Sequence, residues 1–211
     1  MSLVLDFLFP RRCYGCGHPG QYFCSKCAVN LIYCPIKPHS PKNFDGTLTL
    51  FHYRGIIKSA LSDLKFKFIS DLVPEFVTLL TAGIKTGYPH LLKYWQDTAF
   101  TLVPIPLHPS RCRWRGFNQS ELICQELSLK LGLSYQPDIL TRPKNTLPQT
   151  KIKNKSLRRQ NTSSAFSLDP EVIPPSKIIL FDDVATTGST LSSALSSFPS
   201  NTEAWALTIA G

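Results

Sequence analysis

The segment 177–191 constrains the fold more than any other part of the chain. The four apolar residues Ile178–Phe181 come directly before two adjacent acids, Asp182 and Asp183. A loop of small residues around one glycine follows and leads into a helix predicted over Ser189–Phe198. A buried strand that ends in acids before such a loop and helix is typical of open α/β sheets, which bind ligands at the carboxyl edge of their strands.

Further strands and helices are predicted around that segment. Strands are predicted over residues 47–53, 99–107 and 204–210, and helices over 55–68, 71–84 and 118–131. Strands that are apolar throughout and alternate with helices indicate a mainly parallel sheet with helices on both faces. The predicted organisation is a small N-terminal module over 1–33 that begins with a short helix at 3–9, a proline-rich linker over 34–46, and an α/β domain over 47–211.

The loop after the two acids has the composition of a phosphate-binding loop. Its backbone amides and hydroxyl groups can surround a phosphate, and the N-terminus of the following helix adds partial positive charge. Asp182 and Asp183, at the open end of the strand, can accept hydrogen bonds from vicinal ribose hydroxyls. The predicted ligand is a sugar 5-phosphate, and a capped turn with two solvated acids is the simpler alternative. The predicted binding residues are Asp182, Asp183, Ala185, Thr186, Thr187, Gly188, Ser189 and Thr190.

Four cysteines near the N-terminus have the spacing of a zinc site. Cys13 and Cys16 form one Cys-x-x-Cys turn and Cys24 and Cys27 a second, and two such turns can place four thiolates in a tetrahedron around Zn²⁺. Because protein ligands fill all four positions, the predicted role of the ion is structural. Two disulfides or four unmodified thiols are the alternatives. Disulfides need an oxidising compartment, which the N-terminal sequence does not indicate.

Basic residues outnumber acidic ones by 23 to 14, which gives a formal net charge of +9. One cluster consists of Arg111, Arg113 and Arg115, and a second is the run 141–160, which contains no acid. Such clusters favour polyanions or phosphorylated ligands, and a solvated basic loop is the alternative. The basic residues of the run are Arg142, Lys144, Lys151, Lys153, Lys155, Arg158 and Arg159.

The composition excludes two classes of protein. Apolar residues make up 43% of the chain and charged residues 18%, so a hydrophobic core can form and wholesale disorder is excluded. The longest apolar runs are a few residues, far below the roughly 18 that a membrane span needs. The first ten residues lack the basic start and the cleavage site of a secretory signal. We therefore expect a soluble, cytoplasmic protein without a membrane span.

Several motifs together resemble those of a known family. The segment 177–191 resembles the phosphoribosyl-pyrophosphate signature of type I phosphoribosyltransferases. The segments Leu102–His108, Arg115–Gln119 and Leu64–Phe66, with the N-terminal cysteine module, are similar to those of the ComF-type competence family. The resemblance covers nearly the whole chain. Many members have a further Cys-x-x-Cys pair after the first module, where this chain has only Cys34.

The resemblance implies a fold and roles for further residues. The fold would be a twisted, mainly parallel sheet of the type I phosphoribosyltransferase kind, related to amidophosphoribosyltransferases, with flanking helices and a hood. The loop 111–119 resembles the pyrophosphate loop, in which Arg113, Arg115 and Gly116 would face the diphosphate. The basic run 141–160 falls where relatives have a mobile loop over the substrate.

Two functions are consistent with the resemblance. The first is an accessory factor for DNA uptake in natural transformation, which binds phosphoribosyl pyrophosphate or a nucleotide phosphate, single-stranded DNA and DNA-uptake proteins. Tyr14, Tyr22, Phe23 and Trp114 are candidates for stacking on bases, although Trp114 could simply pack. The alternative is an active phosphoribosyltransferase, in which Mg²⁺ neutralises the leaving diphosphate during transfer to a nitrogen acceptor.

Overall fold

The computed structural model describes residues 10–31, 43–143 and 165–211. The predicted helix at 3–9, Cys34 and most of the basic run lie outside these residues. The described elements are α2 (Ser25–Ala28), β1 (Gly46–Phe51), α3 (Gly55–Phe66), α4 (Leu72–Gly87), α5 (Pro89–Asp97), β2 (Thr101–Pro104), α6 (Pro109–Arg115), α7 (Gln119–Leu131), β3 (Ser134–Tyr135), β4 (Leu140–Thr141), β5 (Ser167–Leu168), β6 (Lys177–Val184), α9 (Ser189–Leu195) and β7 (Glu203–Ala210).

Five parallel strands form the central sheet in the order β1-β7-β6-β2-β3. This arrangement confirms the predicted α/β class with a mainly parallel sheet. All residues of β1 and β2 are buried, as expected for strands covered on both faces. Between the neighbouring strands β6 and β7, Phe181 lies opposite Leu207 and Asp182 opposite Thr208. The two acids therefore sit where these strands approach their carboxyl ends.

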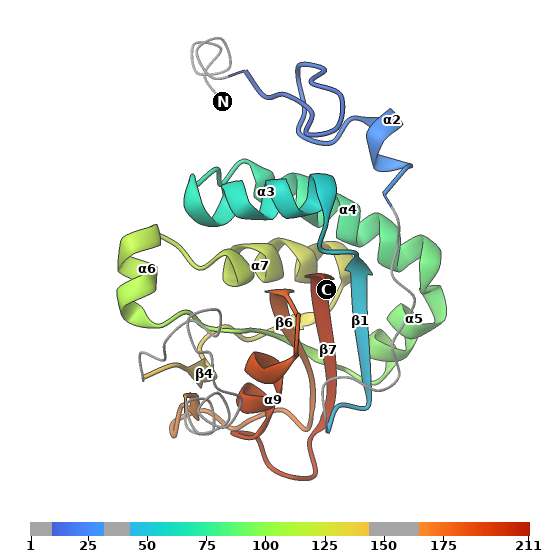
Figure 1. The fold of residues 1–211 in the computed structure, drawn as a ribbon. Coiled ribbons are helices and arrows are strands. Elements are labelled where there is room, and N and C mark those ends of the chain that lie inside the picture. Colours follow the sequence, from blue (N-terminus) through green and yellow to red (C-terminus); the bar gives the residue numbers. More distant parts are fainter. Residues whose placement is uncertain (1–9, 32–42, 144–164) are drawn as a thin grey trace.

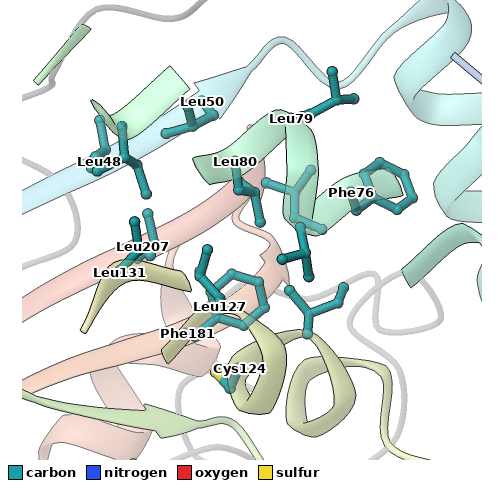
Figure 2. Close-up of a cluster of buried hydrophobic side chains, with 14 of the residues drawn as sticks. Leu48, Leu50, Phe76, Leu79, Leu80, Cys124, Leu127, Leu131, Phe181 and Leu207 are labelled. Atoms are coloured by element: carbon teal, nitrogen blue, oxygen red, sulfur yellow. The ribbon is translucent and has the colours of Figure 1, made fainter. Parts of the chain in front are cut away.

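Helices cover the sheet on both sides (Figure 1). Side chains of α4 and α7, such as Phe76 and Leu127, gather on one face of the sheet with Phe181 (Figure 2), and Leu61 of α3 belongs to the same buried cluster. On the other face, Leu191 of α9 belongs to a second buried cluster, to which the antiparallel pair β4–β5 also contributes. These two layers cover β6, the central strand, on both faces. The polar carboxyl end of β6 lies at the edge of the sheet where the parallel strands end. No helix of the described residues is long and apolar enough to cross a membrane.

The structure differs from the predicted elements in several places. The strand predicted over 99–107 is limited to β2, because the backbone after Pro104 leaves the sheet for α6. Strand β6 continues through both acids to Val184, so Asp182 and Asp183 lie within the strand rather than after it. Helices α5 and α6 and the short strands β3, β4 and β5 were not predicted, because their apolar patterns are too short to show a period.

Candidate functional site

The loop 185–188 joins β6 to α9, and together with the first residues of α9 it borders a small hollow. The backbone N–H of Ala185 donates to the carbonyl of Ala210 at 2.9 Å, which ties the start of the loop to β7. Gly188 precedes α9 with φ 67°, a left-handed conformation that glycine adopts without strain. The residues that line the hollow are Asp182, Val184, Ala185, Thr186, Thr187, Gly188, Ser189, Thr190 and Leu191. Seven of the eight predicted binding residues line the hollow: Asp182, four residues of the loop and the first two residues of α9.

The two acids project from opposite faces of β6, because successive side chains of a strand alternate. Asp182 is half-buried and lines the hollow on the α9 side. Asp183 is only 4% exposed and lies on the side of α3 and α7. The sequence-based expectation placed both side chains at the open end of the strand. The structure corrects this placement for Asp183, because its side chain points to the opposite face of the strand and is buried there.

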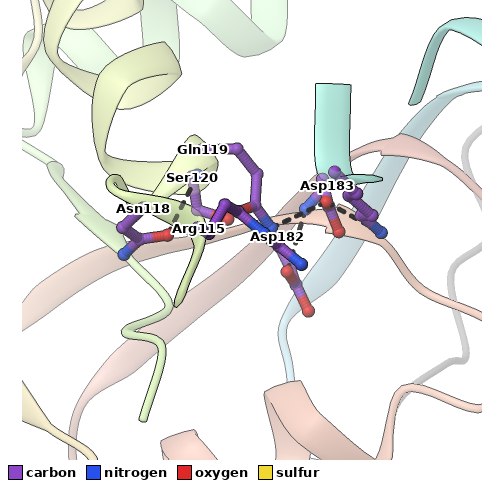
Figure 3. Close-up of polar contacts among 7 residues, drawn as sticks. Arg115, Asn118, Gln119, Ser120, Asp182 and Asp183 are labelled. Atoms are coloured by element: carbon purple, nitrogen blue, oxygen red, sulfur yellow. Dashed lines mark hydrogen bonds and ion pairs between the residues drawn. The ribbon is translucent and has the colours of Figure 1, made fainter. Parts of the chain in front are cut away.

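Asp183 belongs to a buried polar network. Lys65 Nζ of α3 lies 2.8 Å from Asp183 Oδ2, and Gln119 Nε2 donates to the same oxygen at 2.9 Å (Figure 3). Arg115 donates in turn to Gln119 Oε1. Burial disfavours the charged form of Lys65, but the charge of Asp183 and the hydrogen bond to it outweigh burial and raise the pKa of Lys65. The network therefore links α3, β6 and the α6–α7 turn by charge-assisted contacts.

The pKa of Asp182 is raised to about 7. Burial is the largest cause, and the negative charge of Asp183 adds to it, whereas Lys65 acts in the opposite direction. The backbone N–H of Asp183 donates to Asp182 Oδ1 at 2.9 Å, which also favours the ionised form. A carboxyl group in this state can change its protonation near neutral pH.

The arginines predicted in a pyrophosphate loop lie largely in a helix. Arg113 and Arg115 are in the last turn of α6, and Gly116 ends this helix in the left-handed region with φ 82°. The helix forms because Pro109 occupies its first turn and the His108 side chain accepts from the backbone N–H of Ser110 at 3.1 Å. Only the turn 116–118 between α6 and α7 is a loop.

Arg115 is half-buried beside the network, whereas Arg113 is exposed. Burial lowers the pKa of Arg115, and the charge of Arg111 adds to this effect, while Asp183 opposes it. Arg115 Nε is buried and has no hydrogen-bond acceptor among the described residues. Buried donors of this kind are rare in proteins, and a bound anion is one partner that would satisfy it.

Of the basic residues in the run 141–160, the structure describes only Arg142. Its guanidinium lies 5.0 Å from the centre of the Phe166 ring, a cation–π geometry. Burial lowers the pKa of Arg142, the charge of Arg111 adds to this, and the charge of Asp182 opposes it. Lys144, Lys151, Lys153, Lys155, Arg158 and Arg159 lie outside the described residues.

The four N-terminal cysteines come together. The Sγ atoms of Cys13, Cys16, Cys24 and Cys27 all lie within 4.8 Å of one another. Zn–S bonds of about 2.3 Å in a tetrahedron require sulfur–sulfur distances of about 3.8 Å, so this group could hold a zinc ion after small adjustments. A Cβ atom at Gly15 would lie 2.6 Å from Cys27 Sγ, so only glycine lets the first turn approach the second this closely.

Backbone amides also favour a metal at this cluster. The N–H groups of Gly15 and Cys24 each donate to Cys13 Sγ at 3.4 Å. Burial raises the pKa of Cys13, but these amides and the one of Cys16 outweigh it and lower the pKa to about 6. The pKa of Cys27 is raised to about 12. The hydrogen bond with the Cys24 thiol is the largest cause, followed by burial and by the other two thiols. Four thiolates at this distance need a cation to compensate their charge.

The cysteine module packs on the α/β domain through its aromatic residues. Phe23 is buried in the main core, with its ring centre 5.3 Å from that of Phe76 in α4. Glu75 accepts hydrogen bonds from the backbone N–H groups of Tyr22 and Phe23 at 2.8 Å each. Tyr14 donates to Asp63 Oδ2 at 2.9 Å. The ring of Phe23 is thus used for packing and is not available for stacking on bases, whereas Tyr14 and Tyr22 are half-buried, and stacking by these two remains a prediction.

Sequence reasoning gave Lys65 and Gln119 no role of their own. A signal for Lys65 was present, because it follows Leu61 by four residues and so continues the apolar stripe of α3, where a lysine needs a buried partner. Its partner Asp183 lies in another element and has no local signature.

Comparison with known proteins finds relatives along most of the chain. The chain is 31% identical over 182 residues to competence protein F of Haemophilus influenzae, covering 83% of this chain and 74% of the relative. It is 34% identical over 179 residues to DNA utilization protein YhgH of Salmonella typhimurium. This match covers 85% of this chain and 74% of the relative. Competence protein ComFC of Bacillus subtilis is 31% identical over 143 residues, 68% of this chain and 53% of the relative. No family model matches the chain.

Proposed function

Because the chain belongs to the ComF-type competence family, we propose that it is an accessory factor for DNA uptake that binds phosphoribosyl pyrophosphate and single-stranded DNA. The names of relatives support the role in DNA uptake, since they describe competence and DNA utilization proteins. A cytoplasmic location and contacts with other DNA-uptake proteins are part of the same proposal.

The hollow between Asp182 and the segment 185–190, which comprises the loop after β6 and the start of α9, is the observation that carries the phosphoribosyl-pyrophosphate site. The loop would surround the 5-phosphate, and the half-buried Asp182 would accept hydrogen bonds from the ribose hydroxyls. Arg115 would offer its buried Nε to the diphosphate, with Arg113 and Gly116 next to it. Magnesium would be held mainly by the phosphates of the donor, as is usual for this ion. Asp183 would position Lys65, Gln119 and Arg115 from beneath rather than bind the sugar.

Titration calorimetry with phosphoribosyl pyrophosphate and Mg²⁺ tests this site. Asp182→Asn removes a charged acceptor, and a hydrogen bond to a charged group contributes about 1.5–3 kcal/mol, so the affinity should fall about tenfold to a hundredfold. Asp97→Asn is the matched control, because Asp97 lies on α5 in an exposed ion pair with Lys93. Equal affinities of the parent and Asp182→Asn would rule out this site for the sugar.

The same titration at several pH values tests the ionisation of Asp182. Since its pKa is raised to about 7, the carboxyl group is mostly neutral at pH 6 and mostly ionised at pH 8. The ionised form is the stronger acceptor. The ratio of the parent's affinity to that of Asp182→Asn should therefore grow from pH 6 to pH 8, and this ratio cancels the titration of the donor's own phosphates. A ratio independent of pH would contradict the proposed role of Asp182.

Single-stranded DNA binding is tested by a salt series. The logarithm of the affinity should fall with the logarithm of salt concentration by roughly 0.7 for each phosphate neutralised. Replacing Lys151, Lys153 and Lys155 with alanine should lower the affinity and reduce this slope by up to about two units. If the triple variant binds DNA like the parent but loses affinity for phosphoribosyl pyrophosphate, the basic run serves the small ligand. The alternative, an active transferase, would then be favoured, and release of diphosphate with a nitrogen acceptor would demonstrate it.

A further inference from the structure

Three large aromatic side chains are exposed at the C-terminal ends of α3 and α6. Phe66 is 61% exposed, Phe68 40% and Trp114 61%. The rings of Phe68 and Trp114 meet edge to face, with their centres 5.2 Å apart. We call these three residues the aromatic patch. Exposed aromatic side chains that gather from separate elements mark interaction sites more often than single exposed residues do.

The backbone at Phe68 is costly for a phenylalanine. Its φ is 58°, in the left-handed region that favours glycine. It directly follows Lys67, the residue that caps α3, where helices commonly end with glycine. Stability alone therefore does not explain a phenylalanine at this position. Local strain of this kind is characteristic of sites that bind a partner.

Basic residues alternate with the aromatic ones in the sequence of both elements. Lys67 stands between Phe66 and Phe68, and Arg113 and Arg115 flank Trp114. Lys67 and Arg113 are exposed. Asp63 pairs with Lys67 at 3.1 Å and offsets part of its charge, whereas the stretch 108–119 contains no acid. Aromatic faces among positive charges match a flexible polyanion that presents bases, because the phosphates are attracted while the bases stack.

The aromatic patch also borders the site described above. Phe66 follows Lys65 directly and Trp114 precedes Arg115, and both of these basic residues belong to the buried network around Asp183. The network joins the end of α3 to the end of α6, and the aromatic side chains project from these two ends. A backbone that is held in place before binding loses less conformational entropy when a ligand binds.

We infer that the aromatic patch is the surface on which bases of single-stranded DNA stack. The inference rests on the proposed DNA-binding function and names its contact surface. Bases would lie against the faces of Trp114 and Phe68, while Lys67 and Arg113 contact the neighbouring phosphates. A free base could use the same ring faces, but it would not use the surrounding positive charge.

Fluorescence anisotropy with two labelled strands of about twelve nucleotides tests the inference, because single-strand sites usually span about 4–16 nucleotides. One strand is oligothymidylate, and the other has the same length and charge but lacks bases. Trp114→Ala should weaken binding of oligothymidylate about fivefold to a hundredfold, the loss expected for one stacked base, without changing the salt slope. It should not change binding of the abasic strand. Trp114→Phe should retain most of the affinity, since it keeps an aromatic face.

Ile173→Ala is the matched control, because Ile173 is 90% exposed and lies away from the aromatic patch in sequence. A parent that binds oligothymidylate with a steep salt slope, together with a Trp114→Ala variant of equal affinity, would overturn the stacking surface and leave the DNA-binding function standing. An equal loss on both strands would also overturn it, since stacking requires bases. If the parent binds neither strand, the DNA-binding function and the stacking surface are both wrong. Circular dichroism of Trp114→Ala verifies that the fold is retained.

Discussion

The double variant Cys24→Ser, Cys27→Ser is expected to contain almost no zinc, whereas the parent should contain about one zinc per chain. A structural zinc ion needs four protein ligands, and the double variant keeps only two of the thiolates. Zinc binding contributes roughly 10–16 kcal/mol to the folding of small zinc modules, so its loss should unfold the module. Because Phe23 and the amides bound by Glu75 belong to the module, its unfolding would also uncover part of α4. Metal analysis by mass spectrometry measures the first effect and limited proteolysis the second.

Cys112→Ser is the matched control for the zinc prediction. Cys112 lies on α6, outside the cluster of four sulfurs, so this variant should keep about one zinc per chain. A chelator should remove zinc from the parent and loosen the module while the central sheet remains folded, as measured by hydrogen exchange. An unchanged zinc content in the double variant would show that the four cysteines are not the ligands.

Breaking the buried ion pair of Lys65 and Asp183 is expected to have the second large effect. Lys65→Met leaves the carboxylate of Asp183, which is only 4% exposed, without its cation, and removal of one partner of a buried pair costs about 3–5 kcal/mol. Urea unfolding should therefore show a loss of this order in the free energy of unfolding. Asp183→Asn should destabilise the protein as well, because the lysine then loses its anion.

Lys67→Met provides the control for this prediction within the same helix region. Lys67 also pairs with an aspartate, Asp63, at 3.1 Å, but its side chain is 67% exposed. An exposed pair of this kind contributes about 0–1 kcal/mol, so the variant should unfold almost like the parent. The double variant Lys65→Met, Asp183→Asn should recover part of the stability that Lys65→Met loses, because neither charge is left alone. Equal stability of Lys65→Met and Lys67→Met would contradict the role of the buried pair.

The sequence predicted best what depends on neighbouring residues. The apolar run before Asp182, the glycine loop and the start of α9 follow one another in the chain, and the paired Cys-x-x-Cys turns are local as well. The helices α4 and α7 were predicted from periodic apolar positions that the structure buries.

The remaining features depend on contacts between distant parts of the chain. Asp183 and Lys65 are far apart in sequence, so nothing local distinguishes the buried acid from the half-buried Asp182. Alternation along a strand was the available signal, since two adjacent acids in β6 must face opposite sides. Tyr14 and Phe23 likewise look like exposed loop aromatics until Asp63 and Phe76 are placed beside them.

The position of β1 at the edge of the sheet affects the order in which the chain can fold. This strand pairs with β7, and the hydroxyl groups of Thr49 and Thr208, which lie 2.8 Å apart, are separated by 159 residues of chain. During synthesis, β1, α3 and α4 therefore leave the ribosome long before the strand that completes their hydrophobic layer. Such distant pairing slows folding and leaves an unpaired strand and apolar helix faces exposed for the duration of translation.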